Sequence, residues 1–172
     1  MEIVTQHPRD GRALTLAVDI EPGRAKISYG LRNFPDGEVF TSPHAGRTEG
    51  EIFLDLPVTY GGNDIRGIYL RFAAGRIVEY RAEAGGDHLA AIIETDEGSH
   101  RLGEVALGMN PGLDRVLKHP LFVEKVGGTL HVAIGASYED CYVEEPASTE
   151  GRARLEELER SGALNRSAQH VD

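Results

Sequence analysis

The sequence predicts an α+β domain built mainly from antiparallel strands with a few short helices. Apolar and polar residues alternate in several short runs, which is the pattern of half-buried strands. Turn-forming residues separate these runs, because the 172 residues include 21 glycines and 8 prolines. No internal repeat or second domain boundary is visible, so residues 1–172 are expected to form one region.

The predicted strands follow from period-two runs and their flanking turns. The first strand-like run covers residues 14–20. A hairpin is expected at 65–82, because alternating runs lie on both sides of the turn residues Ala74 and Gly75. Two further strands are expected at 102–108 and 129–135, where small and aliphatic residues dominate.

Two stretches have helical spacing. The first covers 87–95, with its aliphatic residues on one side and Asp87 as the expected N-cap. The second covers 150–161, where Leu155 and Leu158 are the only large apolar residues. We expect this second helix to be mostly solvated and to extend away from the core.

Charge and composition exclude several classes of function. The chain has 18 Lys and Arg against 28 Asp and Glu, a net charge of −10, which disfavours nucleic acid and membrane surfaces as partners. No apolar run reaches the roughly 20 residues of a membrane span. The first 20 residues include Glu2, Asp10 and Asp19, whereas a signal peptide would be apolar there, so a cytoplasmic location is expected.

Nucleophilic and nucleotide-binding motifs are missing from the sequence. Cys141 is the only cysteine, so an intramolecular disulfide and a cysteine-rich zinc cluster are both excluded. Its acidic neighbours would raise the pKa of its thiol and make it a poor nucleophile. Neither a glycine-rich phosphate loop nor a serine nucleophile elbow is present.

Two predicted strands each carry one polar residue among small ones. Glu104 shares a strand face with Leu102, Ala106 and Gly108, and His131 shares one with Ala133 and Gly135. Burying an unpaired carboxylate costs free energy, so a buried Glu104 needs a partner for its charge. The small residues leave space beside the carboxylate and the imidazole, and an ion could occupy that space. The alternative is a surface glutamate on an edge strand and a hydrogen-bonded core histidine.

Three more candidate ligands follow from turn and strand chemistry. The rigid turn 35–37 would hold Glu38 at the start of a strand, although the turn alone also fits a simple hairpin. His170 and Asp172 lie two residues apart and would point to the same side of an extended segment, where both can bind one metal. Short strings of this kind also arise by chance. The remaining histidines of interest, which we expect to be solvated, are His44, His88, His100 and His119.

Four ordered blocks of sequence carry a family resemblance. They are NFPDGEVFTSP at 33–43, DEG at 96–98 leading into LGEVALGMNP at 102–111, EKVGGTLHVAIG at 124–135 and NRSAQHVD at 165–172. From about residue 12 to the end, the chain resembles the carboxy-terminal half of the thermophilic metallo-aminopeptidases of the aminopeptidase T and aminopeptidase S type.

The resemblance implies a site for two divalent cations. Position by position, it assigns as ligands Glu38, Glu104, His131, Tyr138, His170 and Asp172. Among these, it also implies catalytic roles for Glu38, Glu104 and Tyr138. The three carboxylates balance two divalent ions when one bridging hydroxide is added, and the donor types suit Zn²⁺, Co²⁺, Mn²⁺ or Mg²⁺.

The function implied is the removal of amino-terminal residues from short peptides by a hydroxide that both metals hold. Homodimers are implied as the assembly. The family's amino-terminal domain is expected to be absent from this chain, and 139–164 is expected to be a solvated insertion.

Two alternatives remain open on the sequence. The set of His131, His170 and Asp172 also matches the ligands of mononuclear non-haem iron enzymes, which would make the chain a ring-cleaving dioxygenase. The other alternative is that the chain is truncated and inactive by itself.

Overall fold

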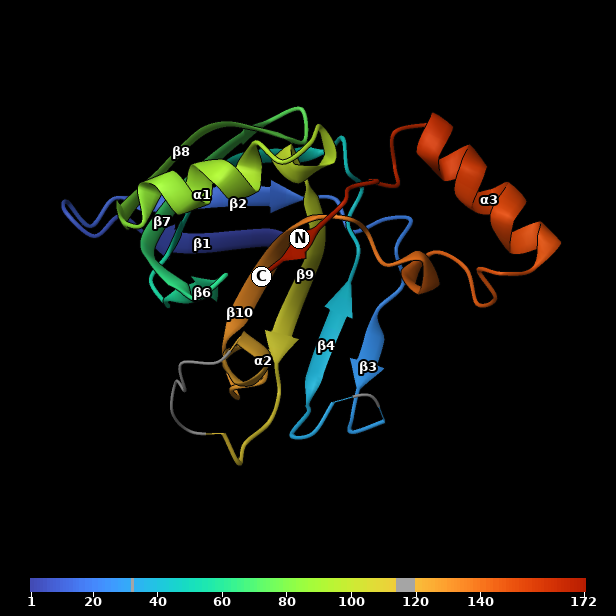
Figure 1. The fold of residues 1–172 in the computed structure, drawn as a ribbon, viewed down its shortest axis with the longest axis horizontal. Coiled ribbons are helices and arrows are strands. Elements are labelled where there is room, and N and C mark those ends of the chain that lie inside the picture. Colours follow the sequence, from blue (N-terminus) through green and yellow to red (C-terminus); the bar gives the residue numbers. More distant parts are fainter. Residues whose placement is uncertain (32, 114–119) are drawn as a thin grey trace.

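The computed structural model describes residues 1–31, 33–113 and 120–172 as two antiparallel sheets around a shared hydrophobic core (Figure 1). The larger sheet has the order β1-β2-β5-β7-β6, and β8 pairs with the other edge of β7. Its strands are β1 (Glu2–Gln6), β2 (Ala13–Val18), β5 (Thr48–Leu54), β6 (Val58–Tyr60), β7 (Asn63–Ala73) and β8 (Arg76–Ala84). The predicted fold class is confirmed.

The smaller sheet has the order β11-β10-β9-β4-β3. Its strands are β3 (Lys26–Ser28), β4 (Glu38–Thr41), β9 (Leu102–Gly108), β10 (Leu130–Gly135) and β11 (His170–Val171). The helices are α1 (Gly86–Ile93), α2 (Pro120–Val123) and α3 (Thr149–Arg160), with short 3₁₀ turns at η1 (Gly98–His100) and η2 (Glu139–Cys141). In the described part of the chain, no helix is long and apolar enough to cross a membrane.

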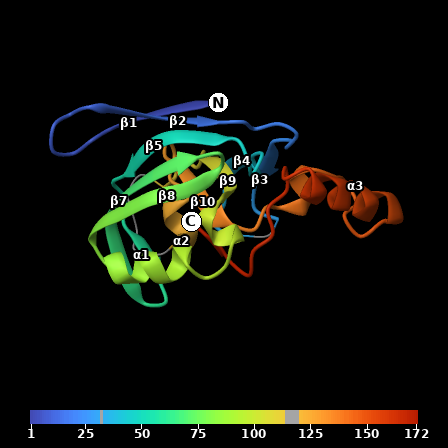
Figure 2. The same ribbon diagram turned by 90° about the horizontal axis from the view of Figure 1, so that it is seen from above.

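The main core joins both sheets and α1. Helix α1 lies beside β7 and β8 (Figure 2) and places Leu89, Ile92 and Ile93 in the core. The larger sheet contributes aliphatic residues such as Ile52 and Leu70, and the smaller sheet contributes its inward-facing residues, which are Leu102, Val105, Val132 and Ile134. The opposite face of the smaller sheet is therefore free to carry polar groups.

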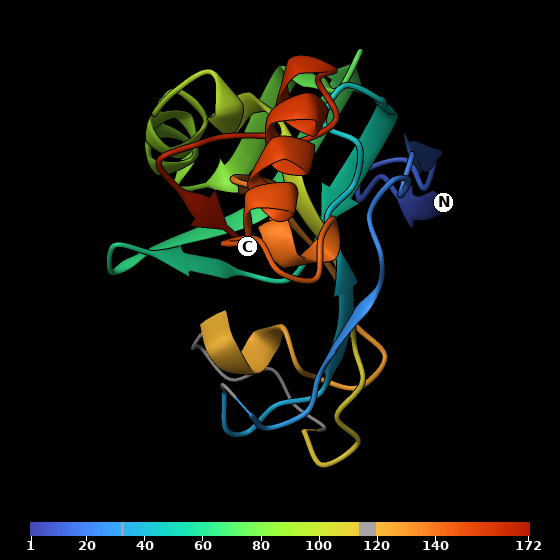
Figure 3. The same cartoon turned by 90° about the vertical axis from the view of Figure 1, so that its right-hand side faces the viewer.

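Helix α3 stands apart from both sheets, at the side of the molecule that faces the viewer in Figure 3. Ser148 caps it by accepting a hydrogen bond from the Gly151 amide at 3.0 Å. Leu155 and Leu158 turn inward and form a second, smaller cluster with Tyr142, Ala163 and Leu164. Most of the helix surface is exposed, as the sequence predicts, but its two leucines have a core of their own.

Several predicted elements differ from the structure in detail. The strand at 14–20 is confirmed as β2, but β1 precedes it, and only Ile3 of β1 is buried in the core. The hairpin at 65–82 is confirmed and is longer at both ends. Helix α1 starts one residue earlier than predicted, and its N-cap is Gly85 with a φ of 77°, so the prediction of Asp87 as the cap is wrong. Gly85 tolerates this left-handed conformation without steric cost.

A bulge at Gly103 changes the predicted face of one residue. Ala133 pairs with Glu104 and Ile134 pairs with Leu102, so Gly103 has no partner across the strands. Leu102 consequently joins the core with Val105, and the prediction that it shares a face with Glu104 is wrong. A side chain at Gly103 would meet the Ala136 carbonyl oxygen at 2.2 Å, which explains the glycine at this bulge.

Candidate metal centre

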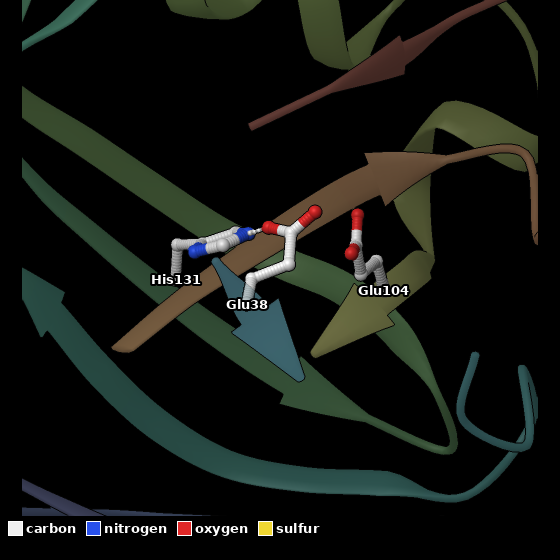
Figure 4. A group of neighbouring side chains, drawn as sticks. All are labelled: Glu38, Glu104 and His131. Carbon is white, nitrogen blue, oxygen red and sulfur yellow. Dashed lines mark ion pairs between the residues drawn. The ribbon is translucent and has the colours of Figure 1, made fainter. Parts of the chain in front are cut away.

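Three neighbouring strands bring the first group of predicted ligands together. Glu38 begins β4, Glu104 lies in β9 and His131 lies in β10, and these strands are adjacent in the sheet. One ligand atom from each residue lies within 4.8 Å of the others. Figure 4 shows the three side chains gathered in one place above the sheet. The family resemblance implies all three residues as ligands.

A second group forms where the last strand pairs with β10. Ligand atoms of Glu104, His170 and Asp172 also lie within 4.8 Å of one another. His170 Nε2 is 2.9 Å from Glu104 Oε2 and 3.8 Å from Asp172 Oδ1. Glu104 therefore belongs to both groups, and its carboxylate lies between them.

Tyr138 lies beside the second group. Its ring centroid is 4.5 Å from that of His170 and 5.3 Å from that of Phe40. Burial raises the pKa of the Tyr138 hydroxyl, and the nearby carboxylates of Glu104 and Asp172 raise it further. All six predicted residues thus meet in one region of the molecule.

Asp96 ties the segment before β11 to the rest of the protein. Its carboxylate accepts hydrogen bonds from the Ala168 amide at 2.6 Å, the Ser167 hydroxyl at 2.9 Å and the Ser99 amide at 2.8 Å. These hydrogen bonds, that from the Ala168 amide above all, lower the pKa of Asp96 to about 2. Asn165 adds a hydrogen bond from its amide to the Gly135 carbonyl at 2.6 Å. The sequence block at 96–98 therefore helps to position His170 and Asp172.

Sequence reasoning missed two charged residues of the centre, Glu124 and Lys125. Lys125 is 1% exposed, although lysine is almost never fully buried without a partner. Its Nζ lies 2.7 Å from Glu38 Oε1 and 2.9 Å from Glu124 Oε2. Glu124 and Lys125 start the 124–135 block, but a charged pair of this kind by itself is typical of a surface turn.

The electrostatics of the histidines differ between the two groups. Burial lowers the pKa of His131 to about 4, and the charges of Lys125 and His170 act in the same direction, so its ring is neutral at pH 7. Burial opposes the charge on His170 as well, but its hydrogen bond to Glu104 and the Asp172 charge outweigh this and raise the pKa to about 9. Burial also raises the pKa of both Glu38 and Glu104.

The residues present fit divalent cations. Glu38 Oε2 is buried without a hydrogen-bond partner, and the nearest ring nitrogen, His131 Nε2, is 3.6 Å away, too far for a good hydrogen bond. Buried polar atoms of this kind are costly unless something binds them. Carboxylate oxygens and a neutral imidazole are suitable donors for a divalent ion.

A cavity of about 620 Å³ opens beside this centre. Its lining includes Glu124, His131 and Asp172 together with apolar residues such as Ile52, Leu54 and Leu130. A mostly apolar cavity with a few convergent polar groups is typical of a ligand site.

Three further histidines of the described residues, and the cysteine, belong to neither ligand group. His88 is exposed as predicted, but His44 is half-buried and the His100 side chain is only 12% exposed, so the prediction of solvation is wrong for these two. His119 lies outside the described residues. Cys141 is buried, and burial raises the pKa of its thiol to about 11, whereas an activated cysteine has a lowered pKa.

Comparison with protein families assigns the chain. The model of the thermophilic metalloprotease family M29 matches residues 21–172. The chain belongs to the M29 family. Among curated M29 relatives, aminopeptidase T of Thermus thermophilus is 40% identical over 146 residues, 81% of this chain and 33% of its own length. Aminopeptidase AmpS of Bacillus subtilis is 39% identical over 148 residues, 83% of this chain and 34% of its own length. The chain thus spans about a third of the length of these relatives.

Solved structures agree with this assignment. Wild-type AmpT from Thermus thermophilus matches 99% of this chain and 41% of its own, with a TM-score of 0.70 and 33% sequence identity. The dioxygenase for 2,5-dihydroxypyridine from Pseudomonas putida matches 79% of this chain and 44% of its own, with a TM-score of 0.56 and 17% identity. The second likeness shows a shared fold alone. The resemblance predicted from the sequence is confirmed: this is an M29 chain homologous to metallo-aminopeptidases.

Proposed function

We propose that this M29 chain forms the centre of a dinuclear metallo-aminopeptidase that removes amino-terminal residues from short peptides. The observation that carries the proposal is the position of Glu104, whose carboxylate takes part in both ligand groups. In this proposal Glu38 and His131 hold one ion, His170 and Asp172 hold the other, and Glu104 is shared. Tyr138 completes the set from beside His170.

When bound, two divalent ions supply a Lewis acid for the scissile carbonyl and an activated water. The chain's own residues prepare that chemistry. The hydrogen-bond contact of His170 Nδ1 with the Ala136 carbonyl, at 2.7 Å, fixes the ring so that Nε2 faces Glu104. Lys125 holds one oxygen of Glu38 and leaves the other free for an ion. The cavity beside the centre provides room for a short peptide.

The hydrolase is favoured over the iron dioxygenase by the grouping of the ligands. His131 is grouped with Glu38 and Glu104, whereas His170 and Asp172 form a separate group with Glu104. A mononuclear iron site would need His131, His170 and Asp172 around one ion.

We also propose that the protein is a homodimer, that it is located in the cytoplasm and that residues 139–164 are an insertion. The proposed metal site does not depend on any of these three properties.

Metal titration of the 172-residue chain tests the proposal. We expect two equivalents of Zn²⁺ or Co²⁺ by calorimetry, and metal-dependent release of leucine from leucine p-nitroanilide. Glu104→Gln should lower the affinity for both ions at least about tenfold, because the shared ligand loses its charge. Glu97→Gln, at an exposed glutamate paired with Arg76, is the matched control and should bind metal normally.

Three results would overturn the proposal. The first is undetectable binding at micromolar metal, and the second is an unchanged metal content in Glu104→Gln. A chain that binds two ions without releasing leucine would retain the metal centre but lose the aminopeptidase assignment.

A further inference from the structure

Glu124 is a fourth carboxylate at the candidate metal centre, and it belongs to neither ligand group. Its side chain is 14% exposed and lines the cavity together with His131 and Asp172. The carboxyl group of Asp172 interacts electrostatically with that of Glu124, and both residues line the same cavity. The cavity wall therefore presents a carboxylate beside a proposed ligand, and no proposed ion uses it.

Lys125 fixes this carboxylate in place. Its Nζ contacts Glu124 Oε2 at 2.9 Å and Glu38 Oε1 at 2.7 Å, so one buried ammonium holds both side chains. A carboxylate held in this way loses little conformational entropy when a ligand binds. Glu124 is thus preorganised between the buried lysine on one side and the cavity on the other.

A carboxylate at this position suits the substrate of an aminopeptidase. Its substrate carries an α-ammonium group, whose nitrogen is two bonds from the carbon of the scissile carbonyl. The residue that binds the ammonium must therefore lie next to the ligands of the ion that polarises that carbonyl. Glu124 meets this condition because it lines the cavity together with Asp172 and shares the Lys125 ammonium with Glu38. A charge-assisted hydrogen bond from an ammonium to a carboxylate is among the stronger polar contacts.

We infer that Glu124 binds the α-ammonium group of the substrate and makes this site selective for free amino termini. The inference rests on the proposed function, because it assumes a peptide bound at the metal centre. It assigns Glu124 a role in substrate binding, and it assigns Lys125 the positioning of Glu124.

Ligand binding to the metal-loaded chain tests the inference. The probes are L-leucine and 2-hydroxy-4-methylpentanoate, which differ in having an ammonium or a hydroxyl group on the α-carbon. The wild-type chain should bind leucine at least about tenfold more tightly by calorimetry. Glu124→Gln should remove most of this preference and keep two bound ions. Glu124→Asp, which retains the charge on a shorter side chain, should show an intermediate preference.

Glu2→Gln is the matched control, because Glu2 also lines the cavity but has no part in the metal centre. It should leave the preference for leucine unchanged. A wild-type chain that binds two ions without distinguishing the two compounds, or without binding either, refutes the inference and leaves the metal centre intact. Loss of an ion in Glu124→Gln also refutes it, because Glu124 would then be a metal ligand. A wild-type chain without metal refutes the proposed function itself.

Discussion

Replacing Lys125 by methionine should show how much this buried ammonium contributes to the stability of the folded chain. It lies among the four carboxylates of the centre, which are those of Glu38, Glu104, Glu124 and Asp172. Lys125 is 1% exposed and its Nζ contacts Glu38 and Glu124 at 2.7 and 2.9 Å. Removing one partner of a buried ion pair costs about 3–5 kcal/mol, because the other charge remains buried without compensation. Part of this cost is relieved in the variant when a carboxylate takes up a proton. We therefore expect Lys125→Met to lower the free energy of unfolding by about 3 kcal/mol at pH 7.

The assay is urea unfolding followed by circular dichroism, in the presence of a chelator. Lys26→Met, at a half-buried lysine in β3 of the same sheet, is the control and should cost less than about 1 kcal/mol. The effect of Lys125→Met should shrink at pH 5, because the carboxylates are then protonated more readily. A double variant that also carries Glu124→Gln should be more stable than Lys125→Met alone, since it has one buried charge fewer. A cost below about 1 kcal/mol in Lys125→Met would refute this reasoning.

Two further predictions concern the carboxy-terminal strand. The folded-state pKa of His170 is raised from 6.5 to about 9, so its contribution to stability is fully present below pH 6.5 and is lost as the pH rises through 9. In urea unfolding, the metal-free chain should lose about 3 kcal/mol of unfolding free energy by pH 10. His170→Gln should abolish most of this dependence of stability on pH. A wild-type stability that does not change with pH would contradict the ion pair between His170 and Glu104. Asp96→Ala should cost about 2–3 kcal/mol and speed hydrogen exchange at the Ala168 amide, while weakening metal binding in calorimetry. Unchanged exchange at Ala168 would show that Asp96 does not hold this strand.

The sequence predicts the parts of the fold that depend on local pattern. Strand β9 has the predicted bounds of 102–108, and the hairpin of β7 and β8 turns at the predicted residues Ala74 and Gly75. In both cases glycine and alternating aliphatic residues mark the element without reference to its neighbours. Strand β1 was missed because an edge strand with one core residue, Ile3, has little hydrophobic signal.

The bulge at Gly103 and the burial of Lys125 could not be read from local sequence. The bulge depends on the register between β9 and β10, which is set by pairing across the sheet. Lys125 is buried because Glu38, distant in sequence, supplies a partner for its charge. Five of the six candidate ligands, by contrast, lie within the sequence blocks that carry the family resemblance, and only Tyr138 lies outside them. Their convergence nevertheless requires the folded sheet.

The two missed residues also bear on the charge balance of the centre. Counting Glu38, Glu104 and Asp172 alone, two divalent ions and one hydroxide give a neutral cluster. Burial, together with the Asp172 charge, raises the pKa of Glu124 to about 7. An ionised Glu124 adds a negative charge and Lys125 adds a positive one, and the two are in contact, so the balance is unchanged. A buried site of this kind is stable only if its charges are compensated. The pair therefore allows the site to present a carboxylate to the cavity without adding net charge to the metal cluster. Lys125 can serve both Glu38 and Glu124 because a single ammonium offers three donors.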